Sequence, residues 1–257
     1  MLPLLVLLSC VGLRQARGPE PLEIQTPMVL GWRLIPGDQL VYDLSSTWRV
    51  GEADTVQRVE RWSYLVRDVD PQGVARLEGS LIAIGVDRVQ GGRRSADPVL
   101  AEALEQEKAR LSQDQVVVEI AMDGRLVDLR GLPWADSLTH RLLALQLSAD
   151  AVDASSAWPD PVLARPYADL LPVPLDVEVS GEQRVQGLYE QGGGLRLRID
   201  GSGQVRATEG GPQIHLQTQS WWDPQAGRLV ERSLQVEMAN LSVADPGILL
   251  LEARLTE

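Results

Sequence analysis

Few side chains in this sequence could act as a nucleophile or a general base. The 257 residues contain two histidines, His140 and His215, and no G-x-S-x-G turn that would present a serine nucleophile. His140 stands beside Arg141 on an expected helix, and His215 falls on the polar side of an expected strand. We therefore expect both histidines to be solvated rather than catalytic.

Metal and cofactor motifs are also missing from the sequence. It has no H-E-x-x-H, no Walker loop, no G-x-G-x-x-G that opens a helix and no calcium-loop pattern. Cys10 is the only cysteine, which excludes an intramolecular disulfide and a cysteine metal cluster. The sequence predicts no catalytic residue, no metal site and no cofactor.

Two carboxylates can hydrolyse a glycosidic bond without histidine, because one acts as the acid and the other as base or nucleophile. The chain has 36 acidic residues, spread over expected turns and exposed strand faces, and no pair stands out among them. Glu102, Glu105 and Glu107 are most simply the solvated face of a helix. A carboxylate-based hydrolase is therefore the least favoured function.

The aromatic residues are unusual, with seven tryptophans and no phenylalanine. We expect Trp48 and Trp62 to lie in the core on opposed strands. Trp221 and Trp222 are adjacent, so they must point to opposite faces of one strand. One of the two could line an apolar ligand or could simply cover the sheet beneath a helix. The second role is favoured, and Trp221 and Trp222 remain the candidate ligand-lining residues.

Residues 1–18 have the pattern of an export segment. The first 13 residues are almost wholly apolar, too few to span a bilayer but typical of a signal peptide. The run ending at Cys10 resembles a bacterial lipobox, whose cysteine is lipidated and becomes the first mature residue. A second interpretation is an ordinary cleavage after Gly18, although Pro19 would then follow the cut. We expect an extracytoplasmic protein. It is either anchored in the cell envelope, in the periplasm, through a lipidated Cys10, or secreted.

The composition beyond this segment is that of a globular protein. Hydrophobic residues make up 44% and charged residues 23%. The net charge of −12 disfavours nucleic acid and anionic lipid as partners. Membrane contact is expected only through the lipidated N-terminus.

Hydrophobic periodicity predicts a chain made mainly of strands. Residues 19–28 indicate an extended tether, and residues 40–50 alternate between apolar and polar side chains with the period of a half-buried strand. A strand over 55–69 with a less clean phase, a turn over 70–73 and a third strand over 74–86 follow.

The middle of the chain changes to a helical period. We expect helices over about 97–113 and 134–148, the second because Leu138, Leu142 and Leu145 recur at helical intervals. Between them a hairpin turns at Asp123-Gly124. Residues 149–174 indicate a long connection.

Alternation resumes at residue 176 and continues to a final strand over 248–255. Along one strand Val230, Leu234, Val236 and Met238 are expected to share a buried face. The sequence therefore predicts a mainly β (α+β) fold. We expect one domain over 29–257, a curved, largely antiparallel sheet or incomplete barrel with about two helices inserted mid-chain.

Several short motifs carry a resemblance to known proteins. They begin with Trp32 to Asp38 and the turn at Asp70, continue with Met122 to Leu126 and Leu171 to Pro174, and end with Trp222 to Leu229. The order of these motifs resembles a class of uncharacterised bacterial envelope lipoproteins. More distantly, the architecture is similar to lipoprotein-carrier half-barrels, in which a curved sheet holds an acyl chain beneath helices.

Three functions follow as expectations. The first is a non-catalytic envelope protein that binds an apolar or lipid-like ligand between sheet and helices. The second is a structural module that is tethered to the membrane and binds an envelope protein partner. The third is the carboxylate hydrolase. An internal cavity would favour the first, and a fully packed core the second.

Overall fold

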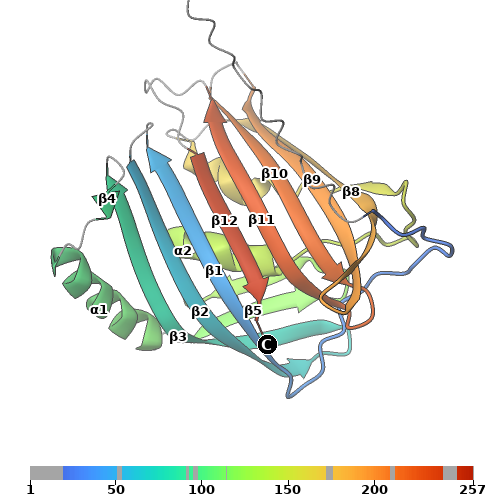
Figure 1. The fold of residues 1–257 in the computed structure, drawn as a ribbon, viewed down its shortest axis with the longest axis horizontal. Helices are drawn as coiled ribbons and strands as arrows, with labels where there is room; N and C mark the ends of the chain where they lie inside the picture. Colours follow the sequence, from blue (N-terminus) through green and yellow to red (C-terminus); the bar gives the residue numbers. More distant parts are fainter. Residues whose placement is uncertain are drawn as a thin grey trace, which may run out of the picture.

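The computed structural model describes residues 20–50, 54–90, 93–94, 98–113, 115–171, 176–208, 212–239 and 248–256. The predicted export segment over 1–18, including Cys10, lies outside these residues. Within them, 12 strands form one sheet in which all pairings are antiparallel (Figure 1).

The strands agree closely with the sequence periodicity. They are β1 (Gln39–Val50), β2 (Asp54–Val69), β3 (Val74–Gln90), β4 (Arg93–Arg94), β5 (Val116–Ala121), β6 (Leu126–Arg130), β7 (Ala157–Pro159), β8 (Val177–Gln191), β9 (Gly194–Ala207), β10 (Gln213–Asp223), β11 (Arg228–Ala239) and β12 (Ile248–Leu255). The order across the sheet is β6-β5-β3-β2-β1-β12-β11-β10-β9-β8-β7, with β4 added to β3. The sheet curves, and β6 and β7 form the two ends of this order in the described chain. The predicted curved antiparallel sheet is confirmed.

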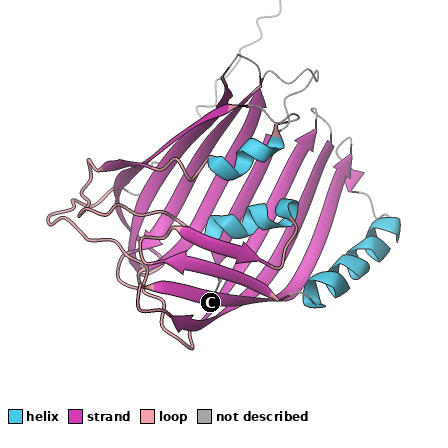
Figure 2. Cartoon of the chain, turned by 180° about the vertical axis from the view of Figure 1, so that it is seen from behind, coloured by secondary structure: helices cyan, strands magenta, loops and turns pink. Residues whose placement is uncertain are grey.

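The helices occupy two different places. The helix α1 (Pro98–Gln113) lies beside β3 at one side of the sheet, whereas α2 (Trp134–His140) crosses the concave face (Figure 2). Short 3-10 helices follow as η1 (Arg141–Leu143) and η2 (Arg165–Leu170). The first predicted helix is confirmed. The second, predicted over 134–148, is wrong beyond residue 143.

The early end of this helical segment has a tertiary cause. Ala144 is extended, and Leu147 donates its backbone N–H to Asp123 at 2.7 Å rather than to a preceding helical carbonyl. The carbonyl of Leu145 accepts a hydrogen bond from the indole of Trp32 at 3.4 Å. Contacts with the β5–β6 turn and with Trp32 thus replace the intrahelical bonds.

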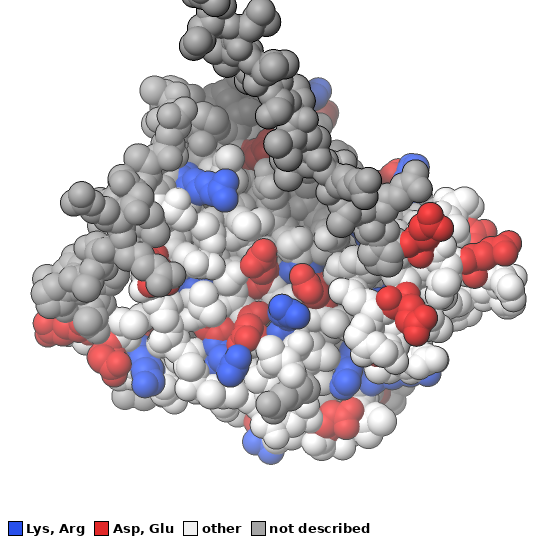
Figure 3. All heavy atoms as spheres, in the orientation of Figure 1, with Lys and Arg blue, Asp and Glu red and all other residues white. Residues whose placement is uncertain are grey.

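The concave face of the sheet carries the core. Along β1 the side chains of Leu40, Tyr42 and Leu44 are buried, as the alternation predicts, and α2 packs against this strand. The opposite face bears paired charges such as Asp43 and Arg61, joined at 2.7 Å. Figure 3 shows acidic and basic side chains interspersed over this outer face.

One predicted face is shifted by a bulge. The β10–β11 register changes between Trp221 and Trp222, so that Trp222 pairs with Leu229. Leu229 is consequently fully buried and Val230 only partly so, contrary to the predicted face that included Val230. Leu234 and Val236 are buried as expected.

The segment predicted as a tether is extended but pairs with the domain. Leu22 forms an antiparallel bridge with Leu188, and Met28 forms one with Val152. Pro21 packs on the backbone of Gly187, where an added Cβ would lie 2.7 Å from the proline side chain. The chain is therefore docked on the domain from Pro21 onward. None of the described helices is long and apolar enough to cross a membrane.

Candidate functional site

A cavity of about 270 Å³ lies between the concave face and α2, and it opens to the surface beside Val56, which is 37% exposed. The sheet contributes apolar side chains of Leu44 and Trp48 on β1, Val56 on β2, Val86 on β3, and Leu249 and Leu251 on β12. Leu138 and Thr139 of α2 form the other wall.

The strands place these side chains together through their register. Ser46 lies opposite Leu251, and Trp48 lies opposite Leu249, so that inward positions of β1 and β12 form adjacent rows. Ser46 is small where its neighbours are large, and it leaves room above the sheet. Trp48, predicted to be a core residue, is only partly buried and faces this space.

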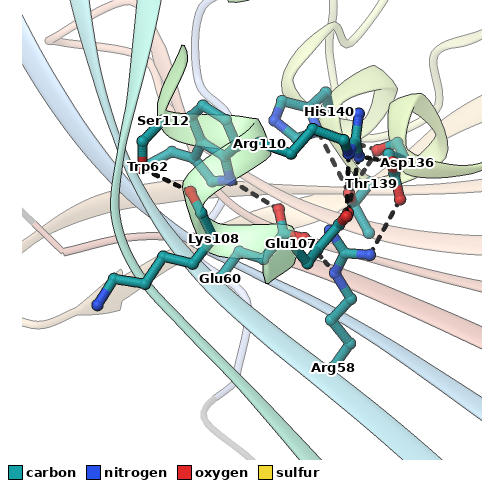
Figure 4. A network of polar contacts seen from close by, with 10 residues as sticks. All are labelled: Arg58, Glu60, Trp62, Glu107, Lys108, Arg110, Ser112, Asp136, Thr139 and His140. Carbon is teal, nitrogen blue, oxygen red and sulfur yellow. Dashed lines mark hydrogen bonds and ion pairs between the residues drawn. The ribbon is translucent and has the colours of Figure 1, made fainter. Parts of the chain in front are cut away.

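A polar network (Figure 4) includes three charged residues of the cavity lining, Arg58, Glu60 and Asp136. The Arg58 guanidinium donates to Glu60, to Asp136 at 3.0 Å and to Glu107 at 3.5 Å. Arg110 donates to the same Asp136 at 2.9 Å and to Glu107 at 2.7 Å. The network therefore joins β2, α1 and α2, and two guanidiniums serve three carboxylates.

Glu60 is the most deeply buried member, with 6% of its side chain exposed. Burial raises the pKa of Glu60. The Arg58 charge and a hydrogen bond from the Trp62 indole N–H, at 2.7 Å, both lower it. Because burial is the largest cause, the pKa of Glu60 stays above its ordinary value. Glu107 is half-buried and paired, and its pKa is lowered by the hydrogen bond from Arg110. The prediction that Glu107 belongs to a solvated face is therefore wrong, whereas Glu102 and Glu105 are exposed as expected.

His140 is fully buried, contrary to the prediction that it is solvated. Its ring packs edge-on against Trp62, with centroids 4.9 Å apart. Burial lowers the pKa of His140 to about 3, so the ring is neutral near pH 7. Its Nδ1 lies 3.2 Å from the carbonyl of Asp136, and Nε2 has no hydrogen-bond partner. His215 is exposed, as predicted.

Glu60 and Asp136 both line the cavity, which is the arrangement that a carboxylate hydrolase requires. All four of their oxygens are nevertheless hydrogen-bonded within the network, to Arg58, Arg110 and Trp62. A general acid or base must direct an oxygen at its substrate. The geometry thus favours a structural role for the pair. In the described part of the chain, no three histidine, cysteine or acidic side chains gather as a metal site would require.

The two candidate ligand-lining tryptophans lie elsewhere. Trp222 is fully buried and packs edge-on against Trp32 at 5.0 Å. Trp221 lies on the opposite face beside Tyr189 at 5.4 Å. Neither is among the residues that line the 270 Å³ cavity, and the structure does not bring them together with Trp48.

No sequence motif pointed to Arg58, Glu60 or Asp136. Arg58 and Glu60 share the inward side of β2 with Trp62 and Tyr64, which explains why the alternation of this strand is less clean. Two charged residues on a buried face were the available signal, because such residues need partners from elsewhere in the fold.

Comparison with known proteins gives a likeness of fold. No family model and no curated protein matches the chain. Among solved structures, the chain is similar to one described as showing lipid–protein interactions in lipovitellin, with a TM-score of 0.54 and 9% sequence identity. The match covers 88% of this chain but 26% of the other, so this chain corresponds to about a quarter of that one.

Proposed function

We propose that this is an exported, non-catalytic envelope protein that binds a small apolar or lipid-like ligand in the cavity between the sheet and α2. The proposal includes the lipid anchor at Cys10 and the membership of the envelope-lipoprotein class that the sequence motifs resemble. The observation that carries the binding function is the 270 Å³ cavity, which is lined mainly by apolar side chains.

The cavity volume sets the size of the ligand. An apolar cavity of about 150 Å³ accommodates benzene, so a cavity of 270 Å³ holds an apolar group of about twice that size. A single acyl chain of medium length or a compact apolar molecule fits this limit, whereas a whole phospholipid does not.

The charges in the cavity lining are compatible with an apolar occupant. Arg58 is paired with Glu60 and Asp136, so none of these three side chains requires an opposite charge on the ligand. Ser46 and Thr139 offer hydroxyl groups for one polar atom. A neutral chain with a hydroxyl end is the chemistry that this lining matches.

The likeness to lipovitellin supports the same class of ligand. That solved structure is described as showing lipid–protein interactions, and its fold resembles this chain over 88% of the residues. The alternative of a tethered interaction module without a ligand has less support, because it predicts a fully packed core.

A neutral probe tests the proposal. We expect 1-decanol to bind the purified protein saturably in isothermal titration calorimetry, and native mass spectrometry of membrane-purified protein to show a co-bound apolar molecule. Ser46→Phe would place an aromatic ring in the cavity and should weaken decanol binding at least tenfold.

Ser45→Phe is the matched control, since Ser45 is the neighbouring residue on the outer face, where its hydroxyl donates to Glu252. This variant should bind decanol like the unmodified protein. Equal affinities for both variants, or no binding by a folded protein, would overturn the proposed function.

A further inference from the structure

A second cavity, of about 100 Å³, lies on another part of the concave face, and its lining combines apolar side chains with several polar and charged ones. It lies among η1, the extended segment after it, the β5–β6 turn, residues 160–163, η2 and β11. Its polar side chains are Arg141, Gln146, Asp160, Tyr167 and Arg232. The exposed residues Arg125 and Val162 also line it, so the cavity reaches the surface there.

Arg232 is the most unusual of these side chains. It points inward from β11 and is only 3% exposed. One of its nitrogens, Nη1, donates to the carbonyl of Ala144 at 2.5 Å, while Nε has no partner. No ion pair joins Arg232 to a carboxylate among the described residues. The charge of the buried Asp160 favours the charged form of Arg232, but no hydrogen bond joins the two side chains. A buried guanidinium without an anion in contact is costly, and an anionic ligand that contacts it would offset this cost.

A second guanidinium and a phenol lie close to Arg232. Arg141 and Tyr167 line the same cavity as Arg232. Burial raises the pKa of Tyr167, and the charges of Arg232 and Arg141 both act against this shift. Arg141 uses its Nε for a long contact of 3.4 Å with Ser137. The wall therefore presents two positive charges and one hydroxyl donor to the cavity.

The only acid in the lining is already engaged. Asp160 accepts hydrogen bonds from the backbone N–H of Leu163 at 3.0 Å and from Gln183 at 2.9 Å. The lining holds three guanidiniums, of Arg125, Arg141 and Arg232, against this one carboxylate, so it carries an excess positive charge in a chain whose net charge is −12. Ser220, which pairs in register with Arg232, also has an unpartnered and buried hydroxyl.

We propose that this cavity binds the carboxylate of a small organic acid between Arg232 and Arg141. Arginine matches a planar carboxylate because its N–H groups donate to both oxygens. A water molecule occupies about 30 Å³ of liquid, so 100 Å³ takes about three non-hydrogen atoms, the size of a carboxylate group. A longer tail could extend toward Arg125 and Val162. The site is independent of the apolar cavity proposed above.

Calorimetric titration of the full chain with three anions tests this site. Propionate represents a free small acid, decanoate a lipid-derived acid, and inorganic phosphate a different oxyanion. We expect saturable binding of propionate or decanoate, and at least tenfold weaker binding of that carboxylate by Arg232→Met and by Arg141→Met. Arg141 is only partly buried, so its variant stays informative if Arg232→Met does not fold.

Arg184→Met is the matched control. This side chain is 59% exposed, is paired with Glu182 and is not part of the cavity lining, so its loss should change the net charge equally without affecting binding. The proposal would be overturned if Arg232→Met and Arg141→Met bound the carboxylate with unchanged affinity. Tighter binding of phosphate than of either carboxylate would also overturn it. Decanol binding that Ser46→Phe weakens, with no carboxylate binding, would remove this site and leave the proposed function standing.

Discussion

At the scale of single residues, polar side chains on the buried face are where this molecule departs from a simple hydrophobic core. Arg58 and Glu60 on β2 satisfy each other and recruit Asp136 from α2. Two buried nitrogens, Nε of Arg232 on β11 and Nε2 of His140, have no hydrogen-bond partner. A buried polar group that lacks a partner costs free energy of folding, so each of these positions has a consequence that can be measured.

His140 should make the protein less stable in acid. The pKa of His140 is about 3 in the folded chain, because the ring is buried, and about 6.5 in an unfolded chain. Between these values the unfolded chain binds a proton that the folded chain does not, so the free energy of unfolding falls as the pH is lowered. The slope is about 1 kcal/mol per pH unit. His140→Phe keeps a ring against Trp62 and removes this contribution.

Urea denaturation at pH 7 and pH 4.5 measures the effect. The loss of stability between the two pH values should be smaller in His140→Phe by about 2 kcal/mol. Glu60 contributes with the opposite sign, because its raised pKa lets the folded chain take up a proton first, but both proteins share that contribution. Equal losses in the two proteins would show that His140 is protonated in the folded state.

The error for His140 shows what the sequence withholds at this scale. A histidine beside Arg141 and near charged residues has the local pattern of a solvated position, yet η1 turns the chain so that Leu142 and Leu143 are buried beside it. Burial there depends on the sheet that faces α2, which is remote in sequence. The inward parity of Arg58 and Glu60, in contrast, was visible in the sequence, although their partners Asp136 and Glu107 were not.

At the scale of elements, the alternation along the chain predicted the strands well, because each long strand buries one face. The β1 and β12 bounds differ from the predicted ones by one residue or less. The predicted helix was wrong over residues 144–148, because tertiary hydrogen bonds hold that segment in an extended conformation. Leu143, Leu145 and Leu147 are buried in alternation there, so a period of two was present but was also compatible with the helical interval.

The turn between β5 and β6 should be sensitive to one methyl group. Gly124 has φ of 79°, and a Cβ would lie 1.7 Å from the carbonyl oxygen of Leu145 and 2.6 Å from the Trp32 indole nitrogen. Gly192 has φ of 62° but no atom within 4 Å of an added Cβ, so it is the matched control. We expect Gly192→Ala to cost about 1 kcal/mol.

Gly124→Ala should cost about 3 kcal/mol or more, because the extended segment after η1 must move away from the turn. Urea denaturation of the two variants gives both values. Similar losses would mean that only the backbone conformation matters at Gly124 and that the contact with Leu145 is easily displaced.

At the scale of the whole molecule, the β1–β12 pairing joins the beginning and the end of the chain in the middle of the sheet. The apolar cavity depends on this pairing, since its walls include Ser46 and Trp48 from β1 and Leu249 and Leu251 from β12. Residues so distant in sequence become neighbours only through the complete topology. The sequence could therefore predict a curved sheet with covering helices, but not which residues would line a cavity.

If Cys10 is lipidated, the docked N-terminal segment would limit how far the domain can stand from a membrane. At most roughly 40 Å of extended chain separates Cys10 from Leu22, and Leu22 is hydrogen-bonded to Leu188 of the domain. If Cys10 is lipidated, the domain stays close to the bilayer, where apolar molecules are concentrated. Fatty-acid labelling in a bacterial host should therefore mark the protein with its original sequence and not the Cys10→Ser variant. Mass spectrometry of the labelled protein should find a lipid-modified Cys10 as the first residue. Ala16→Leu would block the competing cleavage after Gly18 and should leave the labelling unchanged; an unlabelled protein that begins at Pro19 would instead establish a secreted form.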